Sequence, residues 1–360
     1  MNKLVVFGSV NIDEVYSVPH IVKPGETITA LSREELAGGK GANCSVASAR
    51  AGASTHLVSN LGPDGKWILD LVNRSGANVE SSVVSQDKQT GRAIIQVGAD
   101  GENSIFLFPG ANTSHILTTV EEKLNALGLG SGDYLISANE TNLVPEVLEF
   151  SKTELGVVVI YNPAPMPTTN IHSLFESLRF VDILVVNETE LLSLSKLTLE
   201  STQKISISHE DMSHALKSCD YDSLVKYIGI CYAIKLVVVT KGSSGVTAQL
   251  TLNGVENIPR IFVNASPVKQ DFVVDTTAAG DTWIGYFAAS LAESDVHNLF
   301  SRDSPPSIEE LQEYIEIFSA SMKRANYASG IVVTKKGAIP SIPEKSSVDS
   351  FIHSGIIHHQ

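Results

Sequence analysis

The chain of 360 residues has a formal net charge of −14, and an acidic chain repels the nucleic-acid backbone, so we expect no nucleic-acid partner. Hydrophobic residues make up 43% of the chain and charged residues 18%, an ordinary globular composition that argues against a long disordered region. No segment is long and apolar enough to span a bilayer. We therefore expect one domain covering residues 1–360, located in the cytoplasm and, in a eukaryote, also in the nucleus.

The cysteine content indicates a reducing compartment. Cys44, Cys219 and Cys231 are odd in number and show no CxxC spacing, which favours free thiols over disulfides or a zinc site. The ten histidines are scattered, and the pair His358–His359 lies at the end of the chain, so we expect no metal there.

Short runs rich in valine and isoleucine alternate with stretches of helical spacing. The runs cover residues 4–10, 134–138, 157–162, 182–187 and 235–240, and each is typical of a buried parallel strand. After Gly280, one helical face collects Trp283, Ile284, Phe287, Ala288 and Leu291. The alternation predicts an α/β fold with a doubly wound, mostly parallel sheet flanked by helices.

Two regions interrupt this alternation. Residues 91–110 read as two strands around a turn at Asp100–Gly101, which is a strong hairpin signal. Residues 14–35 are irregular and punctuated by Pro and Gly. We expect segments 14–35 and 91–108 to form a small antiparallel sheet that serves as a lid over a site.

Segments 196–225 and 294–307 look like insertions, and surface elaboration is the simplest explanation for them. After the second of these, Ser307 and Glu310 have the spacing of a capping box, which predicts a helix start. A C-terminal tail is expected from about residue 345 to 360.

The glycine-rich segment GGKGAN, residues 38–43, lets the backbone approach a ligand closely just before a helix. Lys40 and Asn43 could bind sugar hydroxyls. A glycine-rich helix start without a ligand is the alternative. The segment is not a Walker A loop, because Lys40 is followed by Gly41 rather than Ser or Thr.

The segment DTTAAGDTWIG, residues 275–285, places three small residues before a helix whose first turn holds Asp281. Free backbone N–H groups and the helix dipole at such a position attract phosphate. A carboxylate there makes sense as a base that takes a proton from an attacking hydroxyl. An ordinary Asp cap is the alternative, and this segment alone does not decide between them.

Polar residues follow several of the predicted strands. Asn11 and Asp13 end the first strand, Glu140 ends the strand that starts near Asp133, and Asn187 and Thr240 follow two later ones. Ligands of open α/β sheets bind beyond the carboxyl ends of the strands, so a site is expected along that edge.

These motifs, in this order, resemble those of the PfkB-type carbohydrate kinases, over nearly the whole chain. The matching segments are SVNID (9–13), GGKGAN (38–43), QTGRAIIQV (89–97), PGAN (109–112), NPAP (162–165), NETE (187–190), TKGSSGV (240–246), DTTAAGDT (275–282) and TKKGAIPSIP (334–343). Several are closer to the ribokinase branch than to adenosine kinase or fructokinase. Tyr286 departs from the family pattern, which prefers Gly or Ala there.

The resemblance implies a role for each matching residue. Asp281 matches the catalytic base, which also touches the sugar. The anion hole for the γ-phosphate is matched by Ala278, Ala279 and Gly280. The sugar-binding residues are matched by Asn11, Asp13, Gly39, Lys40, Asn43 and Glu140. The ATP site is matched by Asn187, Thr240, Lys241, Gly242, Ser243, Ser244, Gly245, Gly280 and Asn326. A monovalent-cation site is matched by Asp275, the Thr277 carbonyl, Val332, Lys335, Gly337 and Ser341.

The activity implied by this resemblance is ATP-dependent phosphorylation of D-ribose at O5 to give D-ribose 5-phosphate. The cofactors implied are Mg²⁺ with ATP and K⁺ as activator, and the lid would form the contact of a homodimer. Two alternatives stay open: another sugar or nucleoside kinase of the family, such as a fructokinase or an adenosine kinase-like enzyme, and a non-catalytic sugar-sensing relative.

Overall fold

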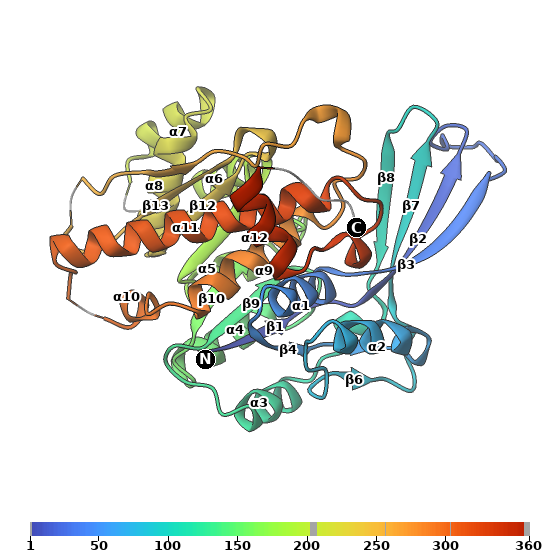
Figure 1. Ribbon diagram of the computed structural model, residues 1–360, viewed down its shortest axis with the longest axis horizontal. Coiled ribbons are helices and arrows are strands. Elements are labelled where there is room, and N and C mark those ends of the chain that lie inside the picture. Colours follow the sequence, from blue (N-terminus) through green and yellow to red (C-terminus); the bar gives the residue numbers. More distant parts are fainter. Residues whose placement is uncertain (1, 202–206, 256, 303, 356–360) are drawn as a thin grey trace.

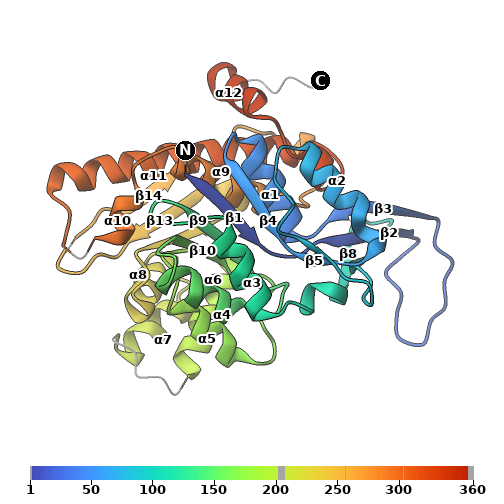
Figure 2. The same ribbon diagram turned by 90° about the horizontal axis from the view of Figure 1, so that it is seen from below.

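An eight-stranded sheet forms the centre of the computed structural model, which describes residues 2–201, 207–255, 257–302 and 304–355. Its strand order is β14-β13-β12-β11-β10-β9-β1-β4 (Figures 1 and 2). The bounds are β1 Lys3–Phe7, β4 Ser54–Val58, β9 Tyr134–Ala138, β10 Val158–Asn162, β11 Ile183–Asn187, β12 Leu236–Thr240, β13 Val246–Leu250 and β14 Ile261–Val263. The strands from β4 to β12 are parallel, whereas β13 and β14 add antiparallel pairs at one edge. The predicted mostly parallel sheet is therefore confirmed.

Helices cover both faces of this sheet. One face packs against α1 Lys40–Arg50, α2 Lys66–Arg74, α9 Ala279–Ala292, α10 His297–Ser301, α11 Ile308–Val332 and α12 Lys345–Ser354. The other packs against α3 Leu117–Ala126, α4 Val144–Thr153, α5 Ile171–Leu178, α6 Glu188–Glu200, α7 His209–Lys217 and α8 Tyr221–Tyr232. Alternate residues of one strand enter different cores, as Val238 and Val239 do, so the buried strands read as continuous apolar runs.

Helix α9 lies between α1 and α11 and is buried on nearly all sides (Figure 1). This differs from the single apolar face expected from the sequence, because two helices and the sheet surround it. Gly285 allows the close approach to α1: a Cβ there would lie 2.5 Å from the Cβ of Ala47. The side chain of Tyr286, the departure from the family pattern, is fully buried, and its hydroxyl donates to the Pro343 carbonyl at 2.8 Å.

A four-stranded sheet of order β3-β2-β7-β8 stands out from one end of the molecule (Figure 1). Its strands are β2 Asn11–Val18, β3 Ser32–Gly38, β7 Gly91–Gly98 and β8 Asn103–Phe108. The predicted hairpin of β7 and β8 is present. The sheet is antiparallel in the β2–β3 and β7–β8 pairs, as expected, but β2 and β7, which come from separate parts of the chain, pair in parallel. A further pair, β5 Asn60–Leu61 and β6 Val83–Val84, lies near its base.

The two suspected insertions are largely helical. Segment 196–225 contains the end of α6, all of α7 and the start of α8, with residues 202–206 outside the described part of the chain. Segment 294–307 contains α10, whose Leu299 and Phe300 are buried in the core. This segment therefore contributes to the core and is not only a surface elaboration. The predicted capping box of Ser307 and Glu310 is confirmed at the start of α11.

In the expected C-terminal tail, residues 345–354 form α12, whereas the pair His358–His359 lies outside the described residues. In the part of the chain that the structure describes, no helix has the length and apolar character needed to cross a membrane.

Candidate active site

The carboxyl ends of the central strands and the base of the protruding sheet meet at one place. The strand β1 ends at Phe7, and the chain then crosses through Gly8–Val10 into β2. Asn11 and Asp13 therefore do not end the first strand, as expected from the sequence, but begin the first strand of the protruding sheet. Both side chains are buried.

The glycines of the segment 38–43 bring the start of α1 against the end of β1. Gly39 has a φ of 93°, a conformation that glycine adopts without strain. A Cβ on Gly41 would lie 2.5 Å from the carbonyl carbon of Gly8, so only glycine fits this contact. The close approach places Lys40 and Asn43 beside the strand ends.

The start of α9 has no side-chain cap, although the Ala279 N–H donates to the Thr276 carbonyl at 3.3 Å. The N-cap residue is Ala278, with φ 60° and ψ 6°, and no side chain caps the helix. A Cβ added to Gly280 would meet no atom within 4 Å, so the space over this turn is open. The alternative that Asp281 serves as the helix cap is therefore wrong.

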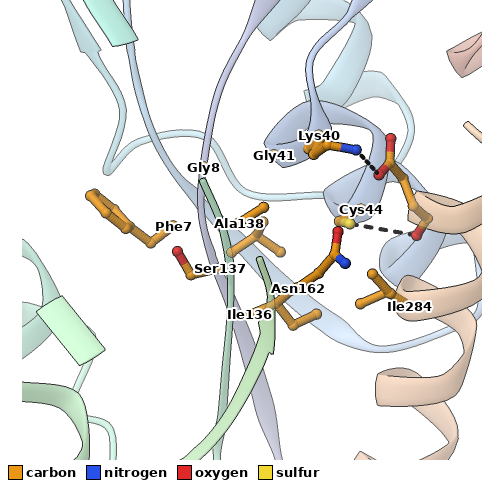
Figure 3. A pocket seen from close by; sticks show the side chains of 12 residues that line it. Phe7, Gly8, Lys40, Gly41, Cys44, Ile136, Ser137, Ala138, Asn162 and Ile284 are labelled. Carbon is orange, nitrogen blue, oxygen red and sulfur yellow. Dashed lines mark hydrogen bonds and ion pairs between the residues drawn. The ribbon is translucent and has the colours of Figure 1, made fainter. Parts of the chain in front are cut away.

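The carboxylate of Asp281 is held between α1 and α9. Its Oδ2 accepts a hydrogen bond of 2.8 Å from Asn43 Nδ2, and its Oδ1 lies 3.6 Å from Lys40 Nζ. The Cys44 thiol donates to the Asp281 carbonyl at 3.5 Å. The negative charge of Asp281, with smaller contributions from Glu140 and Glu190, raises the pKa of Lys40. This effect outweighs burial, which would lower the pKa, so Lys40 stays protonated. Figure 3 shows Lys40 and Cys44 beside a small pocket that Asp281 also lines, with dashed lines for their contacts to it.

Two further carboxylates lie close to this pair. Burial raises the pKa of Asp13 to about 7, and the negative charges of Glu140 and Asp281 add to the effect. Glu140 Oε2 accepts from the Ser9 hydroxyl, from the Lys40 backbone N–H at 3.2 Å and from Asn11 Nδ2 at 3.5 Å. Carboxylates grouped with an ammonium suit a ligand that is rich in hydroxyl groups, since these groups can donate to carboxylates and accept from lysine.

Sequence reasoning missed two residues that support this group. Ser9 fixes Glu140, and Asn112 donates to Asn11 Oδ1 at 2.7 Å while it accepts from the Val10 N–H at 3.0 Å. Asn112 belongs to the PGAN segment, so its position in a matching motif was the available signal. Ser9 likewise begins the matching segment SVNID, which was the available signal for it.

A second group of residues lies at the ends of β11 and β12. Asn187 and Thr240 are opposite each other in the parallel register. Asn187 caps α6, and Glu190 completes a capping box with it. In the turn that follows β12, Lys241 N donates to the Gly245 carbonyl at 2.8 Å, and Gly242, with φ 51°, has open space where a Cβ would be. The predicted nucleotide residues 240–245 thus form one tight turn beside Asn187.

Glu190 is also a residue that sequence reasoning left without a role. Its Oε2 accepts from the Asn187 N–H at 2.9 Å and from Asn162 Nδ2 at 3.4 Å. Asn162 lines the small pocket next to Asp281, so Glu190 joins the two groups of residues. The spacing of Asn187 and Glu190 in NETE is a capping signal, which could have identified this carboxylate at the strand edge.

Asn326 lies on α11 and is buried. Its Oδ1 accepts from Trp283 Nε1 at 2.8 Å, and its Nδ2 donates to the Asn264 carbonyl at 2.7 Å. The side chain therefore joins α9 to the loop after β14. Both the oxygen and the nitrogen of its amide already form hydrogen bonds within the protein. In this it differs from the turn 240–245, where there is open space.

Three of the residues matched to a cation site, Asp275, Thr277 and Gly337, are joined by hydrogen bonds. Asp275 Oδ1 accepts from Thr277 N and Oδ2 from Gly337 N, both at 2.9 Å. Burial opposes ionisation, but these hydrogen bonds outweigh it and keep the pKa of Asp275 below its usual value. Among the described residues Asp275 forms no ion pair, and no group of three His, Cys, Asp or Glu side chains could hold a metal. Val332, Lys335 and Ser341 lie on the same stretch of chain, between the end of α11 and Ile342.

Comparison with known proteins identifies the family of the chain. Residues 1–345 match the model of the pfkB family carbohydrate kinases. A curated ribokinase of Staphylococcus aureus (strain COL) is 32% identical over 350 residues, which cover 95% of this chain and 97% of that protein. A ribokinase structure from Cryptococcus neoformans var. grubii in complex with ADP is 30% identical, with a TM-score of 0.72 over 97% of this chain and 99% of that one. One from Arabidopsis thaliana, complexed with ribose and ATP, is 29% identical, with a TM-score of 0.69 over 98% and 99%.

Proposed function

The chain belongs to the pfkB family of carbohydrate kinases, and we propose that it uses ATP to phosphorylate D-ribose at O5, giving D-ribose 5-phosphate. The observation that carries the mechanism is the position of Asp281. Its carboxylate is oriented by Asn43 and Lys40 next to a helix start that no side chain caps. The full-length similarity to ribokinases favours ribose over the substrates of other branches of the family.

The sugar would lie between the start of α1 and the base of the protruding sheet. The residues proposed to surround the sugar would offer both acceptors and donors to its hydroxyl groups: Asn11, Asp13, Gly39, Lys40, Asn43 and Glu140. The sheet formed by β2, β3, β7 and β8 would act as the lid. When it closes, it excludes water, which would otherwise compete with the sugar as the phosphate acceptor.

Asp281 would act as the general base. As the ribose O5 attacks the γ-phosphorus, its proton moves to a carboxylate oxygen of Asp281, a new O5–P bond forms and the bond from phosphorus to the ADP oxygen breaks. Asn43 and Lys40 keep the carboxylate oriented through the step. General bases of this kind contribute about 10²- to 10⁴-fold in rate.

The first turn of α9, which no side chain caps, would stabilise the transferring phosphoryl group. Backbone N–H groups at Ala278, Ala279 and Gly280 lie at the positive end of the helix dipole, where negative charge is favoured. One such donor contributes roughly 3 kcal/mol in related sites. The open space over Gly280 is the feature that allows a phosphate to come close.

ATP would lie along the strand ends, with Asn187 and the turn 240–245 near its phosphates. Asn326 would lie beside the adenine. Mg²⁺ would come with ATP, and Glu190 at the strand edge has the hard oxygen ligands that this ion prefers. When bound, the ion neutralises phosphate charge.

A monovalent cation is also proposed, with K⁺ as the activator. Asp275 supports it, because this carboxylate keeps its negative charge without an ion-pair partner among the described residues. Thr277, Val332, Lys335, Gly337 and Ser341 would supply further oxygens. Thr277 directly precedes the N-cap Ala278, so the charge of the cation would act on the anion hole.

A homodimer through the lid would cover an exposed apolar strand. All six residues of β8 are exposed, including Ile105, Phe106, Leu107 and Phe108. An exposed apolar edge strand makes a monomer prone to aggregation. Pairing with a second copy of the chain would cover this strand. We place the enzyme in the cytoplasm, a compartment that suits Cys44, Cys219 and Cys231, which form no disulfide within the described part of the chain.

A substrate panel tests the proposal directly. ADP release from ATP should be measured with D-ribose, 2-deoxyribose, fructose and adenosine, each at several concentrations. We expect the highest kcat/KM for D-ribose. A preference for fructose or adenosine would move the protein to another branch of the family. Ribose binding without any ADP release would favour a sensing role.

A further inference from the structure

Segment 196–225, which has no part in the proposed mechanism, ends beside the turn that follows β12. Helix α8 begins at Tyr221, and the Asp220 side chain caps it by accepting from Ser223 N at 3.2 Å. Leu224, Val225 and Ile228 bury the next turns of this helix in the core that also contains Val239 of β12. The position of Tyr221 relative to β12 is thus fixed by core packing.

The ring of Tyr221 lies against the side chain of Lys241. The distance from Lys241 Nζ to the ring centroid is 5.4 Å, which is within the range of a cation–π contact. The Lys241 backbone is held by the turn itself, because its N–H donates to the Gly245 carbonyl and its carbonyl accepts from Ser244 N. The aromatic ring is therefore what restricts the long, otherwise free side chain.

The two carboxylates that flank Tyr221 in the chain have partners of their own. Asp222 pairs with Arg260, and Asp220 is engaged by Ser223. Within the described part of the chain, Lys241 forms no ion pair of its own. A π face leaves the ammonium hydrogens available to an anionic ligand.

We propose that Tyr221 is a positioning residue for nucleotide binding: its ring holds the ammonium of Lys241 at the edge of the turn 240–245, where Lys241 meets the phosphates of a nucleoside di- or triphosphate. The proposal rests on the proposed function, which puts the phosphates next to Asn187 and Thr240. Lys241 directly follows Thr240, which is opposite Asn187 in the sheet.

Four variants and one control test the role of Tyr221. They are Tyr221→Ala, Tyr221→Phe, Lys241→Met, the double variant of Tyr221→Ala with Lys241→Met, and Tyr227→Ala. Tyr227 is also a partly buried tyrosine of α8 packed on the same core, so its variant reports any general loosening of the helix. ADP affinity is measured by calorimetry, and KM for ATP, KM for ribose and kcat are measured by ADP release.

We expect Tyr221→Ala to weaken ADP binding and raise KM for ATP by about 2- to 5-fold, with KM for ribose unchanged. Lys241→Met should weaken ADP binding by about 10-fold, because a charged hydrogen bond to phosphate is lost. In the Lys241→Met background, Tyr221→Ala should then have little further effect. Tyr221→Phe should bind ADP like the parent, since the ring and not the hydroxyl faces the ammonium.

Three results would overturn the proposal: unchanged ADP affinity in Tyr221→Ala, a full Tyr221→Ala effect in the Lys241→Met background, or a loss in Tyr227→Ala equal to that in Tyr221→Ala. The failure of the proposed function looks different. A parent protein that binds ADP but phosphorylates no ribose would refute that function, while the calorimetric comparison would still decide on Tyr221. A parent that binds no ADP would refute both.

Discussion

Asn43 and Asp281, 238 positions apart in the chain, are joined by a hydrogen bond of 2.8 Å from the amide of α1 to the carboxylate of α9. The bond depends on the close packing of these two helices, which Gly285 permits. It gives the proposed base a fixed orientation before any substrate arrives, and pre-organisation of this kind reduces the cost of reaching the transition state.

Replacing Asp281 with Asn should lower kcat by about 10²- to 10⁴-fold, because the amide cannot accept the ribose proton. ADP binding should stay near the parent value, since the change preserves shape and leaves the turn 240–245 untouched. Single-turnover phosphorylation and ADP calorimetry measure the two effects separately. Near-normal turnover in this variant would remove Asp281 from its role.

Replacing Asn43 with Ala should reduce kcat by about 10- to 100-fold, the usual effect of losing one hydrogen bond to a charged group. Because the Asp281 carboxylate remains, the loss should be smaller than in Asp281→Asn. Steady-state kinetics of the two variants side by side provide the check. An equal loss in both would mean that Asn43 does more than orient the base.

Ribose affinity should rise with pH between about 6 and 8, because the pKa of Asp13 is about 7 and its ionised form accepts hydrogen bonds from sugar hydroxyls more strongly than its protonated form. The effect of rising pH on folding stability has the opposite sign. A carboxyl whose pKa is raised by folding favours the folded state when protonated, so its contribution should weaken as the pH rises from about 4 to about 7.

Ribose calorimetry across this pH range tests the first of these effects. Asp13→Asn removes the titrating group and should give an affinity that is weaker and nearly independent of pH. A persistent pH dependence in that variant would show that Asp13 is not the titrating group.

Replacing Na⁺ with K⁺ in the assay should increase kcat/KM in the parent, and Asp275→Ala should remove this difference. The reason is that Asp275 both supplies negative charge and ties Gly337 to the segment before the anion hole. Rates measured at constant ionic strength in the two salts decide the question. Identical rates in the parent would eliminate the cation site.

Gly285→Ala should destabilise the fold by about 1–3 kcal/mol, the usual cost of overpacking a core. Its new Cβ would approach Ala47 to 2.5 Å at the junction of α1 and α9. Gly130→Ala is the matched control, because a Cβ there meets no atom within 4 Å and the residue has no positive φ. Urea unfolding of both variants gives the comparison, and equal midpoints would contradict the packing argument.

The sequence by itself determined five of the eight strands of the central sheet, the hairpin of β7 and β8 and the capping box at Ser307, because each is specified by the local pattern of its own residues. Its motifs also identified most of the side chains that gather around Asp281. The apolar helix face after Gly280 was predicted, but the burial of α9 on nearly all sides was not. That burial depends on neighbours from distant parts of the chain.

Only the tertiary structure decided which of these side chains meet and how they are charged. The parallel pairing of β2 with β7, the supporting bonds of Ser9 and Asn112, and the stacking of Lys241 on Tyr221 join segments that are far apart in sequence. The pKa of Asp13 depends on burial and on two carboxylates brought beside it by folding. Distance and desolvation set such quantities, and neither is encoded in the residues on either side of a position.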